Sequence, residues 1–163
     1  MSARLPPGLS ADSSRQTRLL SQSSVSREFS NFHPMDYTIE NLRRIDDQAP
    51  KFGFSEVQEA RFAREQLGAE TIGLAYHVIK PGKRQAFAHR HDQAEEIYVA
   101  LAGTGRVKLD DDVREIAPMD AIRVAPKVAR AFEAGPDGLE LLVFGPRHAG
   151  DVEIVRDDFW GTA

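Results

Sequence analysis

The chain has 163 residues, which is the length of one ordinary domain with a tail. Hydrophobic residues make up 41% of the chain and charged residues 28%, a composition typical of a soluble globular domain. The net charge of −4 argues against a protein that binds nucleic acid through bulk positive charge, and no run approaches the roughly 18 apolar residues of a membrane span. There is no cysteine, which excludes disulfides, thiolate zinc sites and cysteine nucleophiles. We therefore predict a cytoplasmic protein without nucleic-acid or membrane partners.

The first 34 residues differ from the rest of the chain. They hold nine serines and three prolines and show no sustained apolar pattern. Such a segment buries too little surface to offset its ordering entropy, so we predict a disordered extension over residues 1–34 and one domain over residues 35–163. The extension is rich in Arg and Ser, as organelle transit peptides are. The simpler interpretation is that Met35 is a native start with an extension placed before it.

From about residue 50 onward, apolar residues mostly alternate with polar ones, which is the period of a β-strand. Gly, Pro and Asp residues separate these runs at a spacing typical of β-sandwiches and barrels. The predicted strands are 71–79, 97–101, 106–109, 113–116, 121–124, 130–133 and 139–144. The sequence therefore predicts an all-β domain.

The segment before the first of these strands is ambiguous. Ser55 and Gln58 resemble a capping box, and the apolar residues after them fit a helix ending at Gly68. The run over residues 60–63 fits a strand equally well, and both alternatives stay open.

The pattern His89-Arg90-His91 is the sharpest chemical feature. Two histidines two positions apart on a strand point to the same face, so both imidazoles can reach one ion. Glu96 follows five residues later, and comes back opposite the pair if its strand is the antiparallel partner. Two imidazole nitrogens and one carboxylate oxygen, with open positions left, suit divalent Fe, Mn, Ni or Zn. Taken alone, the pair would more simply be interpreted as ordinary polar strand residues, with Glu95 and Glu96 at a solvated edge.

The spacing around this pair resembles the first sequence motif of the cupin family. That motif is a Gly, five residues, His-x-His, three or four residues, a Glu, six residues and a Gly. Here Gly82 is followed after six residues by His89 and His91, then after four by Glu96, and after six more by Gly103. The resemblance covers about residues 70–145 and implies a cupin-type double-stranded β-helix, a jelly-roll barrel. It further implies a metal at His89, His91 and Glu96 inside the barrel mouth, and commonly a homodimer.

The second cupin motif is degraded in this chain. The family form has a Gly-Asp turn, a strand, Pro-x-Gly and, after two residues, a His that supplies the last metal ligand. Asp120 and Pro126 fit that frame, but Arg130 stands where the His is expected, or Ala131 if the register slips by one residue.

An arginine is always protonated and cannot bind a metal, so Arg130 changes the expected site. It could pair with Glu96 and leave a metal-poor pocket, or it could hold the carboxylate or phosphate of a substrate that also touches the metal. His77 and His148 are alternative fourth ligands, although an ordinary surface or strand role is the simpler interpretation of each. Tyr98 shares strand parity with Glu96 and could present its hydroxyl to the pocket or pack in the core.

Two functional hypotheses follow, because the cupin fold hosts many chemistries. The first is a metal-dependent enzyme on a small anionic or sugar-like molecule, with sugar-phosphate isomerisation and dioxygenation as the reactions that the resemblance suggests. In it the metal is a Lewis acid and Arg130 orients the substrate. The second is a non-catalytic cupin that binds a small molecule with or without metal.

Overall fold

The computed structural model describes residues 37–155 and 158–161, so the extension predicted over residues 1–34 lies outside the described residues. Eight strands form the domain: β1 (Gln58–Phe62), β2 (Ile72–Ile79), β3 (Ala88–His91), β4 (Glu96–Leu109), β5 (Asp112–Ile116), β6 (Ala121–Val124), β7 (Arg130–Pro146) and β8 (Val152–Val155). The helical elements are single turns: η1 (Leu42–Arg44), η2 (Ala49–Phe52) and α1 (Arg64–Leu67). None of the helices in the described part of the chain has the length and apolar character that a membrane crossing requires.

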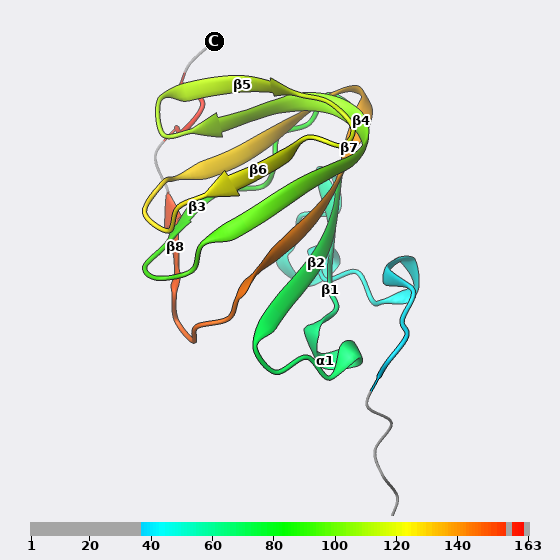
Figure 1. Ribbon diagram of the computed structural model, residues 1–163. Helices are drawn as coiled ribbons and strands as arrows, with labels where there is room; N and C mark the ends of the chain where they lie inside the picture. The colour runs from blue at the N-terminus through cyan, green and yellow to red at the C-terminus, as the bar shows by residue number, and fades with distance from the viewer. Residues whose placement is uncertain (1–36, 156–157, 162–163) are drawn as a thin grey trace, which may run out of the picture. The chain divides into compact units, whose positions relative to one another are not determined.

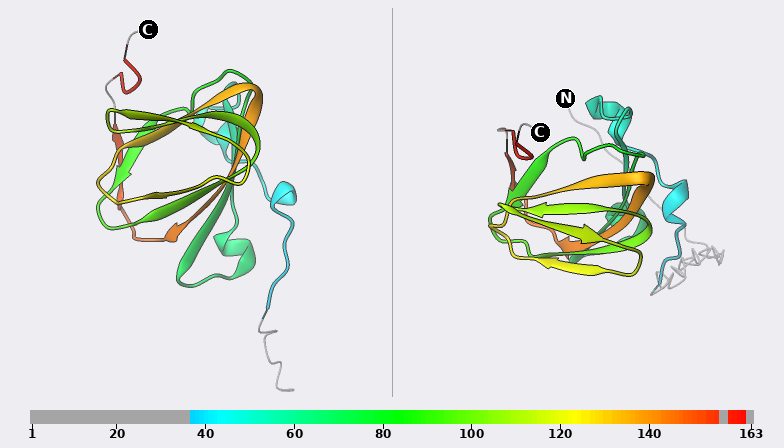
Figure 2. Two further views of the ribbon diagram at one scale, coloured as in Figure 1. Left: turned by 45° about the horizontal axis from the view of Figure 1, so that its top comes forward. Right: turned by 90° about the horizontal axis from the view of Figure 1, so that it is seen from above.

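The strands pair in antiparallel fashion and build two sheets that share their long strands. The first half of β4 pairs with β6 and with the second half of β7, which continues to β2 and β1. The second half of β4 pairs with β5 and with the first half of β7, which continues to β3 and β8. Figures 1 and 2 show the two sheets curling around one interior. This arrangement confirms the all-β, cupin-type jelly-roll prediction.

The long strands β4 and β7 bend together at glycines, where the sequence analysis expected strands to end. The register between them shifts at Gly103/Gly105, opposite residues 135–138 of β7. Gly103 and Gly138 both have positive φ, and a Cβ on Gly103 would lie 2.0 Å from the carbonyl oxygen of Gly138. Only glycine fits such an approach. The Gly-rich segments are therefore bulges that carry each strand from one sheet to the other.

Strand β2 presents its smaller side chains to the interior. The alternation placed Ile72, Leu74, Tyr76 and Val78 on one face, and this is the outer face. Ala75, His77 and Ile79 pair with the buried residues of β7 and face the core. Large side chains from β4 and β7, including Tyr98, Phe132 and Leu141, fill the interior together with Ile79 of β2.

The ambiguous segment before β2 contains both alternatives in turn. Gln58–Phe62 is strand β1, and Arg64–Leu67 is a single helical turn that Gly68 ends in the left-handed conformation. The expected helix end at Gly68 is therefore right, while the longer helix is wrong. Gln58 is instead buried in β1, and its side-chain oxygen accepts a hydrogen bond from the amide of Ala86 at 3.0 Å.

Candidate metal centre

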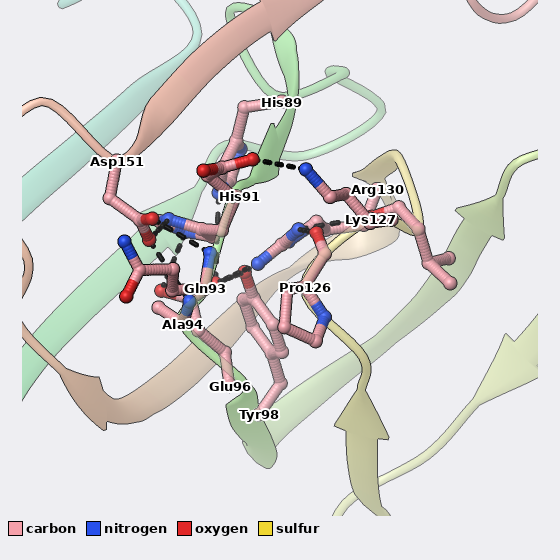
Figure 3. Close-up of polar contacts among 12 residues, drawn as sticks. His89, His91, Gln93, Ala94, Glu96, Tyr98, Pro126, Lys127, Arg130 and Asp151 are labelled. Carbon is pink, nitrogen blue, oxygen red and sulfur yellow. Dashed lines mark hydrogen bonds and ion pairs between the residues drawn. The ribbon is translucent and has the colours of Figure 1, made fainter.

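Both histidines of the His-x-His pair point into the barrel from β3, as strand parity predicts. His89 pairs with Arg130 of β7 in the register of the sheet, and the rings of His89 and His91 lie 5.3 Å apart in an edge-on arrangement. Figure 3 shows both imidazoles beside the side chains of Glu96 and Arg130.

Glu96 reaches the histidines from the facing sheet. The sequence analysis considered β4 as the antiparallel partner of β3, but β4 pairs with β5, β6 and β7, while β3 pairs with β7 and β8. That pairing is therefore wrong, yet the three residues still meet, because the curl of the barrel brings the start of β4 across from β3. Nε2 of His91 lies 3.3 Å from Oε1 of Glu96, and Nε2 of His89 lies 3.7 Å from Oε2. One ligand atom of each residue lies within 4.8 Å of the other two.

Asp151, which the sequence analysis did not single out, orients His91. Its carboxylate lies 3.0 Å from Nδ1 of His91 and accepts hydrogen bonds from the amides of Gln93 at 2.8 Å and Ala94 at 3.0 Å. Burial alone would raise the pKa of Asp151, but these amides and His91 outweigh it and lower the pKa below its usual value. An ionised carboxylate only accepts, so Nδ1 of His91 carries the proton and Nε2 presents its lone pair to the site.

Arg130 enters the same interior and pairs with Glu96, one of the two arrangements that the sequence analysis considered. Its side chain is completely buried and donates to Oε2 of Glu96 at 2.8 Å and to the Tyr98 hydroxyl at 3.2 Å. Two further bonds reach the carbonyl oxygens of Pro126 and Val128. Four of the five donors of the guanidinium are thus used among the described residues.

Tyr98 combines both roles that the sequence left open. Its ring packs against Phe132 in the core, and its hydroxyl donates to Oε2 of Glu96. Burial and the neighbouring Glu96 raise the pKa of Tyr98 well above its usual value, so the hydroxyl keeps its proton. Burial would also raise the pKa of Glu96, but the hydrogen bonds from Tyr98 and Arg130 hold it well below its ordinary range. Glu96 is therefore a carboxylate, with Oε2 fixed by Tyr98 and Arg130.

The two alternative fourth ligands lie outside the cluster of metal-ligating groups found in the described residues. His77 faces the interior, and its ring meets Phe62 edge-on with centroids 5.9 Å apart. Burial, together with nearby His89, lowers the pKa of His77 to about 4, so its imidazole is neutral at neutral pH. His148 is exposed in the turn before β8.

A divalent cation fits the residues that are present. Nε2 of His91 is buried and has no hydrogen-bond partner among the described residues, and it faces Oε1 of Glu96 at 3.3 Å. Both atoms are acceptors, so they repel unless a cation lies between them. Ligand atoms each about 2.1 Å from one ion are about 3.0–3.4 Å apart in octahedral or tetrahedral geometry. His89, His91 and Glu96 thus form a set of two imidazoles and one carboxylate, with Asp151 and Arg130 holding two of the three members.

Comparison with known proteins identifies one domain of the chain. Residues 75–145 match the family model of the cupin domain. A cupin domain therefore lies over these residues. The match falls within the 70–145 range that carries the resemblance in the sequence. A comparison with curated proteins found no match.

Solved structures with the same fold include proteins described with different activities. The polyketide cyclase RemF from Streptomyces resistomycificus is 19% identical with a TM-score of 0.61, covering 72% of this chain and 84% of that one. KdgF from a Halomonas species is 18% identical with a TM-score of 0.55, covering 69% and 96%. A sugar phosphate isomerase from Silicibacter pomeroyi is 16% identical with a TM-score of 0.53, covering 63% and 78%. At these identities the likeness shows the fold of this cupin and leaves its chemistry to the residues of the site.

Proposed function

We propose that this cupin holds one divalent ion at His89, His91 and Glu96 and uses it to bind, and in the enzymatic case act on, a small anionic or sugar-like molecule. The observation that carries the proposal is the pair of facing acceptors, Nε2 of His91 and Oε1 of Glu96, 3.3 Å apart in a buried site. When bound, the ion would supply Lewis-acid polarisation of an oxygen on the small molecule. Three protein ligands suit Fe, Mn, Ni or Zn and leave coordination positions for that oxygen.

The other residues of the site position the ligands and set their charge. Asp151 fixes the ring orientation and the tautomer of His91, as carboxylates behind metal-bound histidines do. Arg130 and Tyr98 hold Oε2 of Glu96, which leaves Oε1 directed toward His91. Arg130 thus stands where the cupin motif has a metal-binding histidine, and it orients the ligand Glu96 instead of binding the metal. Its remaining N–H would donate to an anionic substrate. The cytoplasmic location and the homodimer remain predictions.

A metal-free binding protein is the second candidate, and the ion pair between Arg130 and Glu96 supports it. The guanidinium neutralises the buried carboxylate at 2.8 Å, so the site needs no second cation for charge balance. In this alternative a small molecule would hydrogen-bond directly to the imidazoles.

Metal analysis by mass spectrometry of the purified and the reloaded protein separates the two candidates. We expect about one ion per chain in the wild type and loss of the ion in His91→Ala and in Glu96→Gln. Asp151→Asn should keep all three ligands and weaken metal affinity by about 10–100-fold, as for other residues behind metal ligands.

Two matched controls make this test specific. Glu140→Gln removes a carboxylate that also pairs with an arginine and a tyrosine but lies on the outer face, and His148→Ala removes an exposed histidine. Both should keep the wild-type metal content. A wild type that takes up no Fe, Mn, Ni or Zn after reloading would leave the metal-free candidate, and equal losses in the controls would show that the metal binds elsewhere.

A further inference from the structure

Three large apolar side chains are exposed on the inner face of the barrel wall, which is the face that carries the histidines. In the register of the sheet, Ile154 of β8 pairs with His89, and Val152 pairs with His91. Antiparallel partners point to the same face, so both side chains face the site, although they are 47% and 54% exposed. Phe62 of β1, which is 51% exposed, pairs with the inward-facing Ala75 and contacts His77.

These residues belong to the edges of the two sheets. The strands β1 and β8 are the two ends of the path β1-β2-β7-β3-β8, and Figure 1 shows them on opposite sides of the barrel. An exposed apolar residue on an outer face is ordinary. The interior here holds buried imidazole nitrogens that have no partner among the described residues. Apolar residues at the opening of such an interior indicate where the apolar part of a bound ligand would extend out of the polar site.

A groove continues this apolar surface away from the histidines. Its volume is about 520 Å³, and it is lined by Ile154 together with four aromatic residues, Phe54, Phe87, Phe159 and Trp160. Phe87 links the groove to the site, because its ring lies 6.0 Å from that of His89. The volume lies within the range of about 300–1,000 Å³ typical of small-molecule sites.

The groove offers polar as well as apolar surface, and its polar side chains are those of Arg84, Gln85 and Asp158. Arg84 donates to Glu133 at 2.5 Å and also lies over the ring of Trp160, which leaves Gln85 and Asp158 as the other polar groups in the lining. A polyhydroxylated ligand loses hydrogen bonds to water when aromatic and aliphatic side chains cover it. An apolar ligand body gains free energy at the same surface.

We propose that the ligand of this site is a small carboxylic acid with an apolar body, whose carboxylate meets the metal centre and whose body lies over Phe87 and Ile154 into the groove. The position of the ligand's carboxylate rests on the proposed function. The apolar character of the rest of the ligand rests on Ile154, Val152 and the groove. It makes Ile154 and Val152 specificity-determining residues. Among the anionic and sugar-like molecules considered above, it selects amphipathic acids over sugars and sugar phosphates.

Straight-chain carboxylates from acetate to octanoate test the proposal, with glucose 6-phosphate as the polar comparison. Binding to the metal-loaded and the chelator-treated protein would be measured by calorimetry or by NMR shifts. Each buried methylene contributes about 0.8 kcal/mol, so we expect affinity to rise about fourfold per methylene until the groove is filled. Glucose 6-phosphate should bind more weakly than hexanoate.

Ile154→Asn and Ile97→Asn form the decisive pair of variants. Both isoleucines lie on strands and are similarly exposed, at 47% and 43%, but Ile97 lies on the outer face. Ile154→Asn should flatten the dependence on chain length and weaken octanoate binding by tenfold or more. Ile97→Asn should keep the wild-type series, and metal content should be unchanged in both.

The outcomes separate this inference from the proposed function. Metal binding without any rise of affinity along the series, or with tighter binding of glucose 6-phosphate, overturns the inference and leaves the metal centre intact. A rise that persists in the chelator-treated protein and disappears in Ile154→Asn supports the apolar site even where the metal proposal fails. If Ile154→Asn changes only the oligomeric state, a second copy covers these side chains and the inference is wrong.

Discussion

The same three functional groups meet at two places in this protein. Inside the barrel, the carboxylate of Glu96 accepts hydrogen bonds from the Tyr98 hydroxyl and the Arg130 guanidinium. On the outer face, the carboxylate of Glu140 accepts hydrogen bonds from the Tyr76 hydroxyl at 2.5 Å and the Arg43 guanidinium at 3.0 Å. We call these the inner trio and the outer trio.

Their surroundings differ. The Arg130 side chain is fully buried, whereas that of Arg43 is 72% exposed. The inner trio faces two imidazoles and leaves Oε1 of Glu96 directed at His91. Among the described residues, the side-chain hydrogen bonds and ion pairs of the outer trio join only its own three members. The two trios therefore share their residue types and their charge pairing. Burial next to two histidines is what makes the inner trio part of a candidate metal centre. The outer trio therefore serves as the reference for the effect of burial on the inner trio.

Replacing the arginine of the inner trio should lower the free energy of unfolding more than the other changes. Arg130→Leu leaves the buried Glu96 carboxylate without its cation, which costs about 3–5 kcal/mol of unfolding free energy for a buried pair. Arg43→Leu should change stability little, because water reaches the half-buried Glu140 carboxylate and solvates it once its partner is lost. Urea unfolding at pH 7 measures both variants.

The double variant Glu96→Leu/Arg130→Leu checks this interpretation. It removes both charges together, so it should be more stable than Arg130→Leu alone. Equal destabilisation by Arg130→Leu and Arg43→Leu would contradict the difference in burial on which the comparison rests.

As the pH falls, the barrel interior that holds the inner trio should lose stability at a higher pH than the outer trio does. The pKa of His77 is about 4 in the folded chain, and that of an unfolded histidine is about 6.5. Between these values the unfolded chain binds more protons, so stability falls as the pH drops from about 6.5 to 4, by up to about 3 kcal/mol. The pKa of Glu140 is lowered by its bonds to Tyr76 and Arg43, so its contribution is lost only below about pH 4.5.

Unfolding free energies measured at pH 7, 5.5 and 4.5 in the wild type and in His77→Gln test this prediction. The variant should be less sensitive to acid over this range, whereas the matched control His148→Gln should follow the wild type. An identical pH dependence of wild type and His77→Gln would show that His77 takes up its proton without opposing the fold.

Removing the tyrosine hydroxyl should have the smallest effect of the three. Tyr98→Phe deletes the donor to Glu96 and the acceptor for Arg130, and hydrogen bonds to charged groups contribute about 1.5–3 kcal/mol. Tyr76→Phe should cost less, because water reaches the outer carboxylate and replaces the hydroxyl. Thermal unfolding of the two variants measures the difference, and a larger loss for Tyr76→Phe would reverse the comparison.

Much of the fold could be predicted from the sequence, because alternation and turn residues act locally. The strands β2, β5 and β6 were predicted nearly to their ends. The long strands β4 and β7 were each divided in two, since Gly103 and Gly138 punctuate a sequence in the same way whether they end a strand or bend it. Which face of β2 is buried depends on the side chains that β4 and β7 bring to the interior, so the alternation of β2 could not decide it.

The sequence by itself indicated the three candidate ligands, because two positions on one face of a strand are a local fact and the resemblance to the first cupin motif singled out Glu96. It also placed Arg130 where a histidine is expected. Only the tertiary structure decided that Glu96 arrives from the facing sheet, that Asp151 lies behind His91, and that Ile154 and Val152 face the site. The contacts of Asp151, Val152 and Ile154 with the histidines join residues about 60 positions apart, which no local pattern pairs. All of these contacts form because burying the apolar faces of both sheets closes the barrel around the polar groups.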